Sequence, residues 1–420
     1  MLDAAGWIRE RVFPRAGLRD AARMGVEAEL LAFDAETHEP VRINDRLLPF
    51  LIACTSSHHG RVHTGSKGCA RVSLPGGGTF TFEPGGQLEY ASPPFHEPSR
   101  LTRDLEKRLL PLVSAARDEG IVLLGAGIDP FNDPGRVPLQ IVTDRYCRMD
   151  AYFESIGAAG RRMMRQTAGI QVNIDATESP DDVWQLLNAA APFLTALFAN
   201  SRTYAGADTG FASYRAETWR HTDARRTGIF ACDSDAVSEY ARFALEAPAM
   251  DVPRDDGYAS FEECWREGRF DGDAWAHHLT TLFPEIRPKG YFEIRSIDAQ
   301  PPEQMALPVL LCAGLVLDAG AQAEAARMLG SPDIELLHTA GRDGLGDPVI
   351  ESRCRDLVTI ALEGCRRLGV HRCHAADIER AETRARELLS GRRPQAMYWR
   401  PGGMNGTAIS ASRSPPASGR

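Results

Sequence analysis

Five glutamates of this 420-residue chain stand in stretches where polar and apolar residues alternate. They are Glu27, Glu29, Glu83, Glu89 and Glu293. Glutamate forms strands poorly and like charges repel, so a face that carries several carboxylates is costly unless cations bind between them. Magnesium prefers oxygen ligands and works with a few carboxylates together with substrate phosphates. The five residues therefore predict a magnesium site that serves phosphoryl chemistry.

Strands are predicted to position these side chains. They span residues 25–31, a hairpin over 79–90 with a Pro-Gly-Gly turn, residues 169–175 and residues 291–296. Successive side chains of a strand point to opposite faces, so Glu27 and Glu29 share one face of the first strand. Gln171 and Asn173 share a face of the third strand in the same way. The pattern predicts a sheet with one apolar face and one face of carboxylates and amides.

A solvated sheet face is the alternative for any single strand, because antiparallel sheets often expose one side. Such a face would more naturally carry Thr, Lys or Ser than Glu, which weakens this alternative for the set. Arg295 shares its strand face with Glu293 at a spacing of two, and a surface ion pair explains it poorly. Lys289 is equally compatible with a contact to a phosphate and with a solvated position.

The composition excludes several classes of protein. The net charge is −9, from 48 basic and 57 acidic residues, which argues against a nucleic-acid partner. No apolar run is long enough for a membrane span, and the N-terminus does not resemble a signal peptide. The nine cysteines are scattered and form no Cys-x-x-Cys pair, so we expect reduced thiols and a cytoplasmic location. A Walker-type phosphate loop is also missing from the sequence.

A single domain is expected over residues 1–395, followed by a disordered tail over 396–420 that is rich in Gly, Ser and Pro. Glycines over 64–78 predict a flexible loop. Helical periodicity predicts helices near residues 99–120, 180–197, 235–247, 303–328, 350–368 and 375–390. The predicted class is therefore α+β.

Several motifs together resemble those of the glutamate–cysteine ligases of the plant and actinobacterial type. They are Gly25-Val-Glu-Ala-Glu-Leu, Phe82-Glu-Pro-Gly-Gly-Gln-Leu-Glu89, Met163 through Asp175, Trp219 through Gly228, and His278 through Arg295. The resemblance spans about residues 25–320 and is strongest to the members that serve bacterial ergothioneine biosynthesis. It implies a glutamine-synthetase-like catalytic fold, in which a curved antiparallel sheet binds ATP and magnesium on its concave face and carries helices on its outer face.

The resemblance also implies roles for individual residues. The five glutamates would be metal ligands, and Glu293 would act in catalysis together with Arg295, which would stabilise the transferring phosphoryl group. Nucleotide contacts would come from Gln171, Asn173 and Lys289, although Gln171 stands where related ligases place a metal-binding histidine. Substrate carboxylates would be held by Arg165 and Arg226, because guanidinium groups suit carboxylates. Trp219, His277 and His278 are expected to serve packing.

The implied reaction joins the γ-carboxylate of glutamate to the amine of cysteine through a γ-glutamyl phosphate, which yields γ-glutamylcysteine, ADP and phosphate. The expected partners are thus glutamate, cysteine and ATP. Another amine acceptor is an alternative, because the carboxylate face serves only the ATP half of the reaction. A non-catalytic protein that binds nucleotide or metal is a second alternative, although none of the five glutamates is lost. γ-Glutamylcysteine could lead to ergothioneine, glutathione or another thiol.

Overall fold

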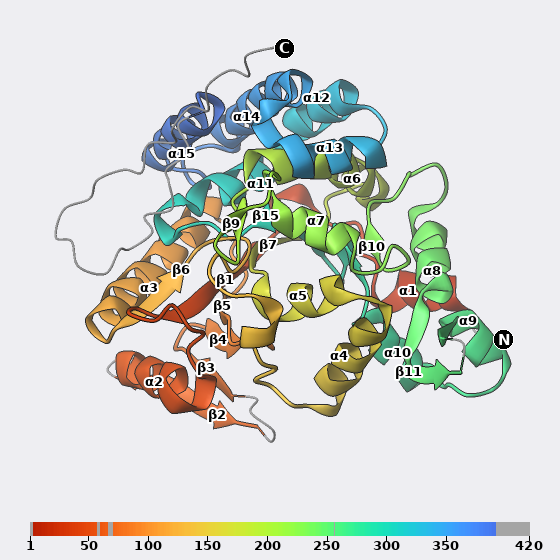
Figure 1. Ribbon diagram of the computed structural model, residues 1–420. Helices are drawn as coiled ribbons and strands as arrows, with labels where there is room; N and C mark the ends of the chain where they lie inside the picture. Colours follow the sequence, from red (N-terminus) through yellow and green to blue (C-terminus); the bar gives the residue numbers. More distant parts are fainter. Residues whose placement is uncertain (1–2, 57–58, 66–69, 256, 392–420) are drawn as a thin grey trace, which may run out of the picture.

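A large antiparallel sheet forms the centre of the molecule in a computed structural model, which describes residues 3–56, 59–65, 70–255 and 257–391 (Figure 1). Its strands are β1 (Met24–Asp34), β2 (Arg61–Thr64), β3 (Ala70–Ser73), β4 (Thr79–Phe82), β5 (Leu88–Ala91), β6 (Ile121–Leu124), β7 (Gly169–Ile174), β14 (Ile286–Pro288) and β15 (Phe292–Asp298). The strand order is β14-β15-β7-β1-β5-β4-β3-β2, and β6 pairs with the second half of β1. The sheet is open, because its edge strands β14 and β2 do not pair with each other.

Three small strand pairs lie outside this sheet. They are β8 (Thr203–Tyr204) with β9 (Ala207–Asp208), β10 (Thr227–Gly228) with β13 (Phe283–Pro284), and β11 (Pro248–Arg254) with β12 (Gly257–Ser260). The pair of β10 and β13 is parallel, whereas every pair within the large sheet is antiparallel.

Helices lie on both sides of the sheet, and one layer of them covers its apolar face. The helices are α1 (Ala4–Arg11), α2 (Leu48–Ser56), α3 (Pro98–Asp118), α4 (Asp144–Ile156), α5 (Ala158–Gln166), α6 (Pro180–Leu197), α7 (Tyr214–Arg220), α8 (Ala236–Glu246), α9 (Phe261–Arg266), α10 (Gly272–Leu279), α11 (Ala306–Leu317), α12 (Ala319–Leu329), α13 (Ile334–Asp343), α14 (Pro348–Leu368) and α15 (Ala375–Leu389). α3, α6 and α11 contact the sheet directly, and α12, α14 and α15 pack behind them, in blue in Figure 1. The predicted α+β class, with helices on the outer face of an antiparallel sheet, is confirmed.

The apolar faces of the strands explain this layering. Val26, Ala28 and Leu30 of β1 are almost fully buried, and they belong to the same core as Leu101 and Leu105 of α3. Helical residues four apart share one face, so α3 presents a continuous apolar stripe to the sheet. The opposite face of β1, which carries Glu27 and Glu29, is thereby turned away from the helices that form this core.

A second, smaller core lies beside the polar face. It contains Met149, Tyr152 and Phe153 of α4, Met163 and Met164 of α5, Trp219 of α7, Met250 and Phe283. This core joins α4, α5 and α7; Figure 1 shows α4 and α5 on the side of the sheet opposite to α14 and α15, and α7 beside α13.

Two predictions of elements are wrong in part. The helix expected over 303–328 is two helices, α11 and α12, which meet at Asp318 and bend by 96°. Asp318 has an extended backbone and caps α12, since its side chain accepts a hydrogen bond from the backbone amide of Ala321. The loop expected over 64–78 contains β3, which pairs on both sides with β2 and β4. The other predicted helices and strands are present, with small shifts of their ends.

No single helix in the described ranges is long and apolar enough to cross a bilayer. The bent pair Pro302–Leu317 and Ala319–Leu329 passes by length and composition only. Its first helix is buried in the protein core along nearly its whole length. The largest apolar core includes residues from Ala4 to Leu388, and the single domain expected over 1–395 stays a prediction. The predicted tail over 396–420 lies outside the described residues, and the boundary at 395 stays a prediction.

Candidate active site

Strand register brings the predicted polar side chains onto one face. Glu29 of β1 lies directly opposite Glu89 of β5. On the other side of β1, Glu27 lies opposite Gln171 of β7. Directly opposite residues of an antiparallel pair project to the same face, at about 5 Å between their Cβ atoms. The carboxylates therefore become neighbours although they are far apart in the sequence.

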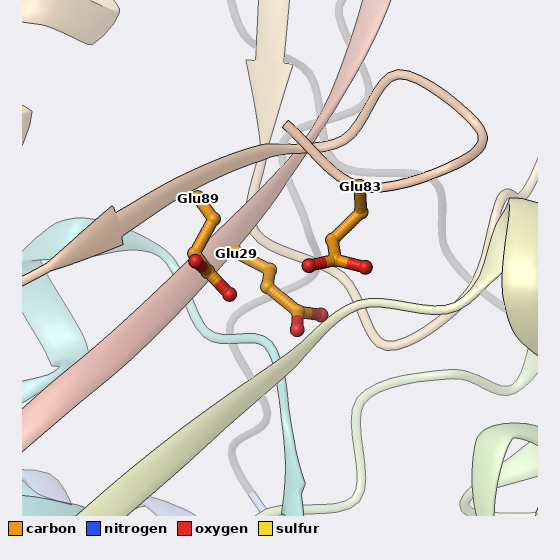
Figure 2. Close-up of side chains that lie close together, drawn as sticks. All are labelled: Glu29, Glu83 and Glu89. Atoms are coloured by element: carbon orange, nitrogen blue, oxygen red, sulfur yellow. The ribbon is translucent and has the colours of Figure 1, made fainter. Parts of the chain in front are cut away.

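Three of the five predicted metal ligands form a compact group, called here the glutamate cluster. It consists of Glu29, Glu83 and Glu89, and each offers a carboxylate oxygen that lies within 4.8 Å of the others (Figure 2). Glu83 reaches the group because the chain turns sharply between β4 and β5. Gly85 is required in this turn, since a Cβ atom there would lie 1.9 Å from the backbone oxygen of Arg165.

Hydrogen bonds fix the orientation of two of these carboxylates. Glu29 accepts a bond of 2.7 Å from the backbone amide of Gly169 and one of 2.9 Å from the side chain of Gln171. Glu89 accepts a bond of 2.6 Å from the hydroxyl of Thr81. The three carboxylates remain close enough together for one ion to contact all of them.

The electrostatics of the cluster favour a bound cation. Burial, and then repulsion from Glu29, raises the pKa of Glu83 to about 7. Burial and the charge of Glu83 raise the pKa of Glu89 well above its usual range. Burial also raises the pKa of Glu29, against the opposing charges of Arg215 and Arg295. Carboxylates that resist ionisation in this way need protons or a metal ion nearby, and an all-oxygen donor set suits magnesium.

Glu293 lies in a different environment from the cluster. It is fully buried, and its carboxylate contacts a cation group made of Arg287 at 2.6 Å, Lys289 at 2.9 Å and Arg295 at 3.0 Å. Burial alone would raise the pKa of Glu293, but these three cations hold it well below its usual range. Both oxygens are therefore occupied by cationic side chains. The prediction that Glu293 binds metal finds no support in this geometry. Its contact with Arg295 agrees with the strand face that the two residues were predicted to share.

Gln171 connects the glutamate cluster and the cation group. Its amide nitrogen donates to Glu29, and its amide oxygen accepts a bond of 2.7 Å from Arg295. Asn173 donates to Glu27 at 3.1 Å, while its own amide oxygen is buried without a partner. Glu27 also lies 3.9 Å from the ammonium group of Lys289. The face thus runs from carboxylates at one end to guanidinium and ammonium groups at the other.

The two arginines predicted to bind substrate are held by the protein. Arg165 pairs with Asp150 and donates to the backbone oxygen of Val137 at 3.3 Å, although its Nε is buried without a partner. Arg226 is fully buried. Its partners are Asp223, Thr281 and the backbone oxygen of Pro248. A substrate role for Arg226 finds no support, because every nitrogen of its guanidinium already has a protein acceptor.

Sequence reasoning missed three residues of this region. Arg287 pairs with Glu293 across the β14–β15 ladder. Arg145 and Tyr146 of α4 lie close enough to Glu83 to act on it: the charge of Arg145 opposes the rise in its pKa, and Glu83 in turn raises the pKa of Tyr146. The position of Arg287, two residues before Lys289 in a strand, was a usable signal. The segment of α4 carries no motif that could have pointed to the site.

The residues expected to serve packing do so in two cases. Trp219 is buried, and its ring lies beneath the guanidinium of Arg295 at 5.3 Å. His278 is buried, stacks on Phe261 and contacts the backbone oxygen of Ala244 at 2.8 Å. His277 lies nearer the surface, 3.7 Å from Asp251.

Comparisons with known proteins identify sequences that are similar to this chain. The family model described as glutamate-cysteine ligase family 2 matches residues 23–406. A glutamate–cysteine ligase, EgtA, of Mycolicibacterium smegmatis is 35% identical over 346 residues, which cover 77% of each chain. The chloroplastic glutamate–cysteine ligase of Arabidopsis thaliana is 29% identical over 84% of this chain and 72% of its own.

A solved structure of a glutamate–cysteine ligase from Francisella tularensis, in complex with AMP, is also similar. It is 14% identical over 92% of this chain and 84% of its own, with a TM-score of 0.48.

Proposed function

Since this chain belongs to glutamate–cysteine ligase family 2, we propose that it joins the γ-carboxylate of glutamate to the amine of cysteine and converts ATP to ADP and phosphate. The observation that carries the proposal is the division of one sheet face into a glutamate cluster and a cation group, linked by Gln171. A ligase of this kind has to hold a metal–nucleotide complex and a transferring phosphoryl group side by side.

Magnesium would be held by Glu29, Glu83 and Glu89, with Glu27 at the border of the site. This assignment is supported by the oxygen donor set and by the raised pKa values of the three clustered carboxyl groups. When bound, magnesium would neutralise charge on the phosphate oxygens of ATP. Gln171 would keep Glu29 oriented, and the unpartnered amide oxygen of Asn173 is available to a ligand.

In the first proposed step, the γ-carboxylate of glutamate attacks the γ-phosphorus of ATP and ADP leaves. The cation group would stand beside the transferring phosphoryl group, where guanidinium donors stabilise negative oxygens. Glu293 would position these cations rather than bind metal, because it contacts all three of them. In the second step, the cysteine amine attacks the acyl phosphate and phosphate leaves.

The test is a reaction of purified protein with ATP, magnesium, glutamate and cysteine. We expect ADP, phosphate and γ-glutamylcysteine in equal amounts, and no product when any one component is omitted.

A screen of other amines under the same conditions tests the acceptor, since the carboxylate face does not discriminate between amines. Absence of ADP release with every amine would refute the ligase assignment. ATP binding without turnover would favour a non-catalytic protein.

The remaining expectations belong to the same proposal. Partners are limited to small molecules, with neither nucleic acid nor membrane among them, and the protein acts in the cytoplasm. The acidic net charge of −9 supports the absence of a nucleic-acid partner. Cell fractionation with an antibody to the protein tests the location.

A further inference from the structure

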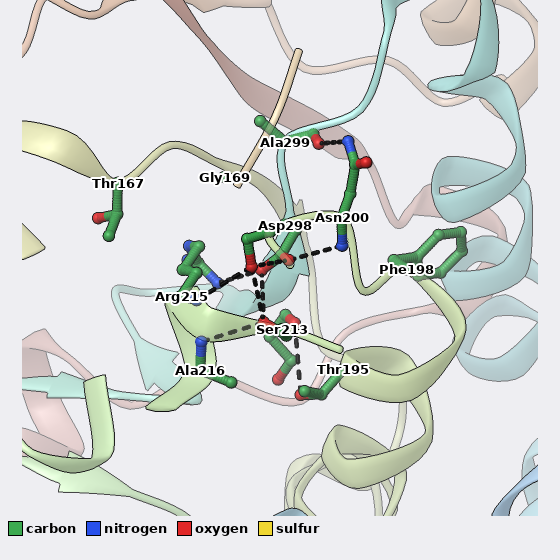
Figure 3. A network of polar contacts seen from close by, with 12 residues as sticks. Thr167, Gly169, Thr195, Phe198, Asn200, Ser213, Arg215, Ala216, Asp298 and Ala299 are labelled. Carbon is green, nitrogen blue, oxygen red and sulfur yellow. Dashed lines mark hydrogen bonds and ion pairs between the residues drawn. The ribbon is translucent and has the colours of Figure 1, made fainter. Parts of the chain in front are cut away.

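Asp298 is a buried carboxylate that the proposed mechanism does not use. Its side chain is 1% exposed and accepts bonds from the backbone amide of Asn200 at 2.7 Å, the hydroxyl of Ser201 at 2.7 Å and the hydroxyl of Ser213 at 2.9 Å (Figure 3). It also lies 3.7 Å from the guanidinium of Arg215. So many donors around one buried carboxylate fix its position within the fold.

A bulge in β15 places Asp298 on the sheet face that carries the glutamate cluster and the cation group, called here the catalytic face. Ile294 lies opposite Val172 and Ile297 lies opposite Ile170, so three steps along β15 match two along β7. Such an extra residue reverses the alternation of faces beyond it. Asp298 consequently projects to the side of Glu293, as its pairing with Gly169 also indicates.

Arg215 connects Asp298 to the proposed site. Its guanidinium donates a bond of 2.9 Å to the backbone oxygen of Arg295. It occupies the space above Gly169, where a Cβ atom would lie 2.8 Å from its terminal nitrogen. The backbone amide of Gly169 in turn binds Glu29. Arg215 therefore lies beside both a proposed metal ligand and the proposed phosphoryl-stabilising residue.

A shared aromatic ring strengthens this connection. The guanidinium of Arg215 lies 5.8 Å from the ring of Trp219, and that of Arg295 lies 5.3 Å from the same ring. The side chain of Arg215 is only 6% exposed, so solvent contributes little to its orientation. A buried ion pair of this kind adds little net stability, because the cost of taking both charges out of water offsets their attraction.

We propose that Asp298 and Arg215 form a positioning pair that holds Arg295 and Glu29 in register for phosphoryl transfer. Asp298 holds the guanidinium of Arg215. Arg215 in turn binds the backbone oxygen of Arg295 and packs against Gly169, whose amide binds Glu29. Neither residue needs to touch substrate. The inference rests on the proposed function, because its consequences are read in the ligase reaction.

The experiment compares Asp298→Asn with a matched control, Asp377→Asn. Asp377 is 5% exposed and pairs with Arg380 on α15, and it contacts neither the glutamate cluster nor the cation group. We expect Asp298→Asn to lower kcat about 10- to 100-fold, because a small displacement of catalytic groups has effects of that size. The KM values for glutamate and ATP should stay within about 3-fold, since ground-state binding is retained. Asp377→Asn should lower the melting temperature without this loss of kcat.

A double-mutant cycle tests whether the effect passes through Arg295. In the Arg295→Lys background, Asp298→Asn should lower kcat by less than about 3-fold, because residues that act as a unit are not additive. Equal losses in both backgrounds would overturn the proposal, as would a wild-type kcat per folded molecule in Asp298→Asn.

Arg215→Lys covers the case in which Asp298→Asn does not fold. It keeps the charge but cannot contact Asp298 and the Arg295 backbone with one planar group. A loss of kcat with unchanged KM supports the pair, and wild-type kinetics overturn it. If the wild-type protein itself forms no ADP, the proposed function is wrong. A wild-type protein that does form ADP, with variants that behave like it, would instead refute only the positioning role of the pair.

Discussion

At the scale of single residues, the glutamates of the catalytic face lie in two different electrostatic environments. Buried carboxylates whose nearest charged neighbours are other carboxylates become difficult to ionise, as Glu83 and Glu89 do. A carboxylate that shares its space with arginine and lysine stays ionised, as in Glu293. The environment therefore decides which glutamate is suited to receive a metal ion and which one to orient cations.

Replacement of Glu83 tests the glutamate cluster. We expect Glu83→Gln to lower kcat/KM at least about 100-fold, since even residues one step removed from a metal cost 10- to 100-fold.

The metal-free variant should nevertheless be more stable than the wild type at pH 8. The pKa of Glu83 is raised to about 7, so the wild type loses stability as the pH rises from about 4.5 through 7, and the amide does not. Thermal unfolding in EDTA across this range measures the difference. A variant with wild-type pH dependence contradicts the assignment.

A matched pair of variants distinguishes the two kinds of glutamate. Glu89→Gln should raise the magnesium concentration that gives half-maximal activity, because it removes a proposed ligand. Glu293→Gln should leave that concentration nearly unchanged and lower kcat, since its carboxylate binds the cation group. Magnesium titrations of the residual activity make the comparison. An equal rise in both variants would restore Glu293 as a metal ligand.

At the scale of elements, the break between α11 and α12 depends on one capping residue. The side chain of Asp318 accepts from the backbone of Ala321 at 2.7 Å and from Arg367 of α14 at 2.8 Å. It thus caps α12 and ties it to the neighbouring helix. The apolar periodicity continues across this point, which is why the sequence pattern predicted one long helix.

We expect Asp318→Ala to lower the free energy of unfolding by about 1–2 kcal/mol, the usual range for a lost N-cap. The control is Asp333→Ala, which removes the cap of α13 but no ion pair to an arginine. It should cost less than Asp318→Ala, and both variants should keep the wild-type kcat. Urea unfolding measures the two costs. An unchanged unfolding midpoint in Asp318→Ala would contradict the role of the cap.

At the scale of the whole molecule, a buried histidine makes the fold sensitive to acid. Burial, and then the charge of Arg226, lowers the pKa of His278 to about 3. The unfolded chain titrates near 6.5, so the stability contributed by neutral His278 is complete above that pH and is lost as the pH falls toward 3. The loss amounts to about 2 kcal/mol at pH 5, from about 1.4 kcal/mol for each unit below 6.5.

His278→Gln should therefore show a smaller decrease in unfolding free energy between pH 7.5 and pH 5 than the wild type, although its stability at pH 7.5 is lower. His338→Gln is the control, because it removes a histidine whose side chain is partly exposed rather than buried. Urea unfolding at the two pH values gives the comparison. Identical slopes in all three proteins would show that His278 does not titrate on unfolding.

The sequence by itself determined the faces of the strands and the family. Alternation is a local property, so it assigned Glu27 and Glu29 to one face of their strand, and Gln171 and Asn173 to one face of theirs, without knowledge of the fold. Motifs that are continuous in the chain carried the family resemblance, which the match over residues 23–406 confirmed. The roles of individual site residues stay predictions.

Only the tertiary structure decided which of these side chains meet. Register between distant strands joined Glu29 to Glu89, and the contacts of Glu293 with cations depend on the pairing of β14 with β15. The bulge in β15 turned Asp298 toward the catalytic face, against the simple period of two. Burial and the contacts of Arg226 with Asp223, Thr281 and Pro248 likewise follow from tertiary packing. Register, bulges and burial arise from pairing between segments far apart in the chain, and a local pattern contains no information about them.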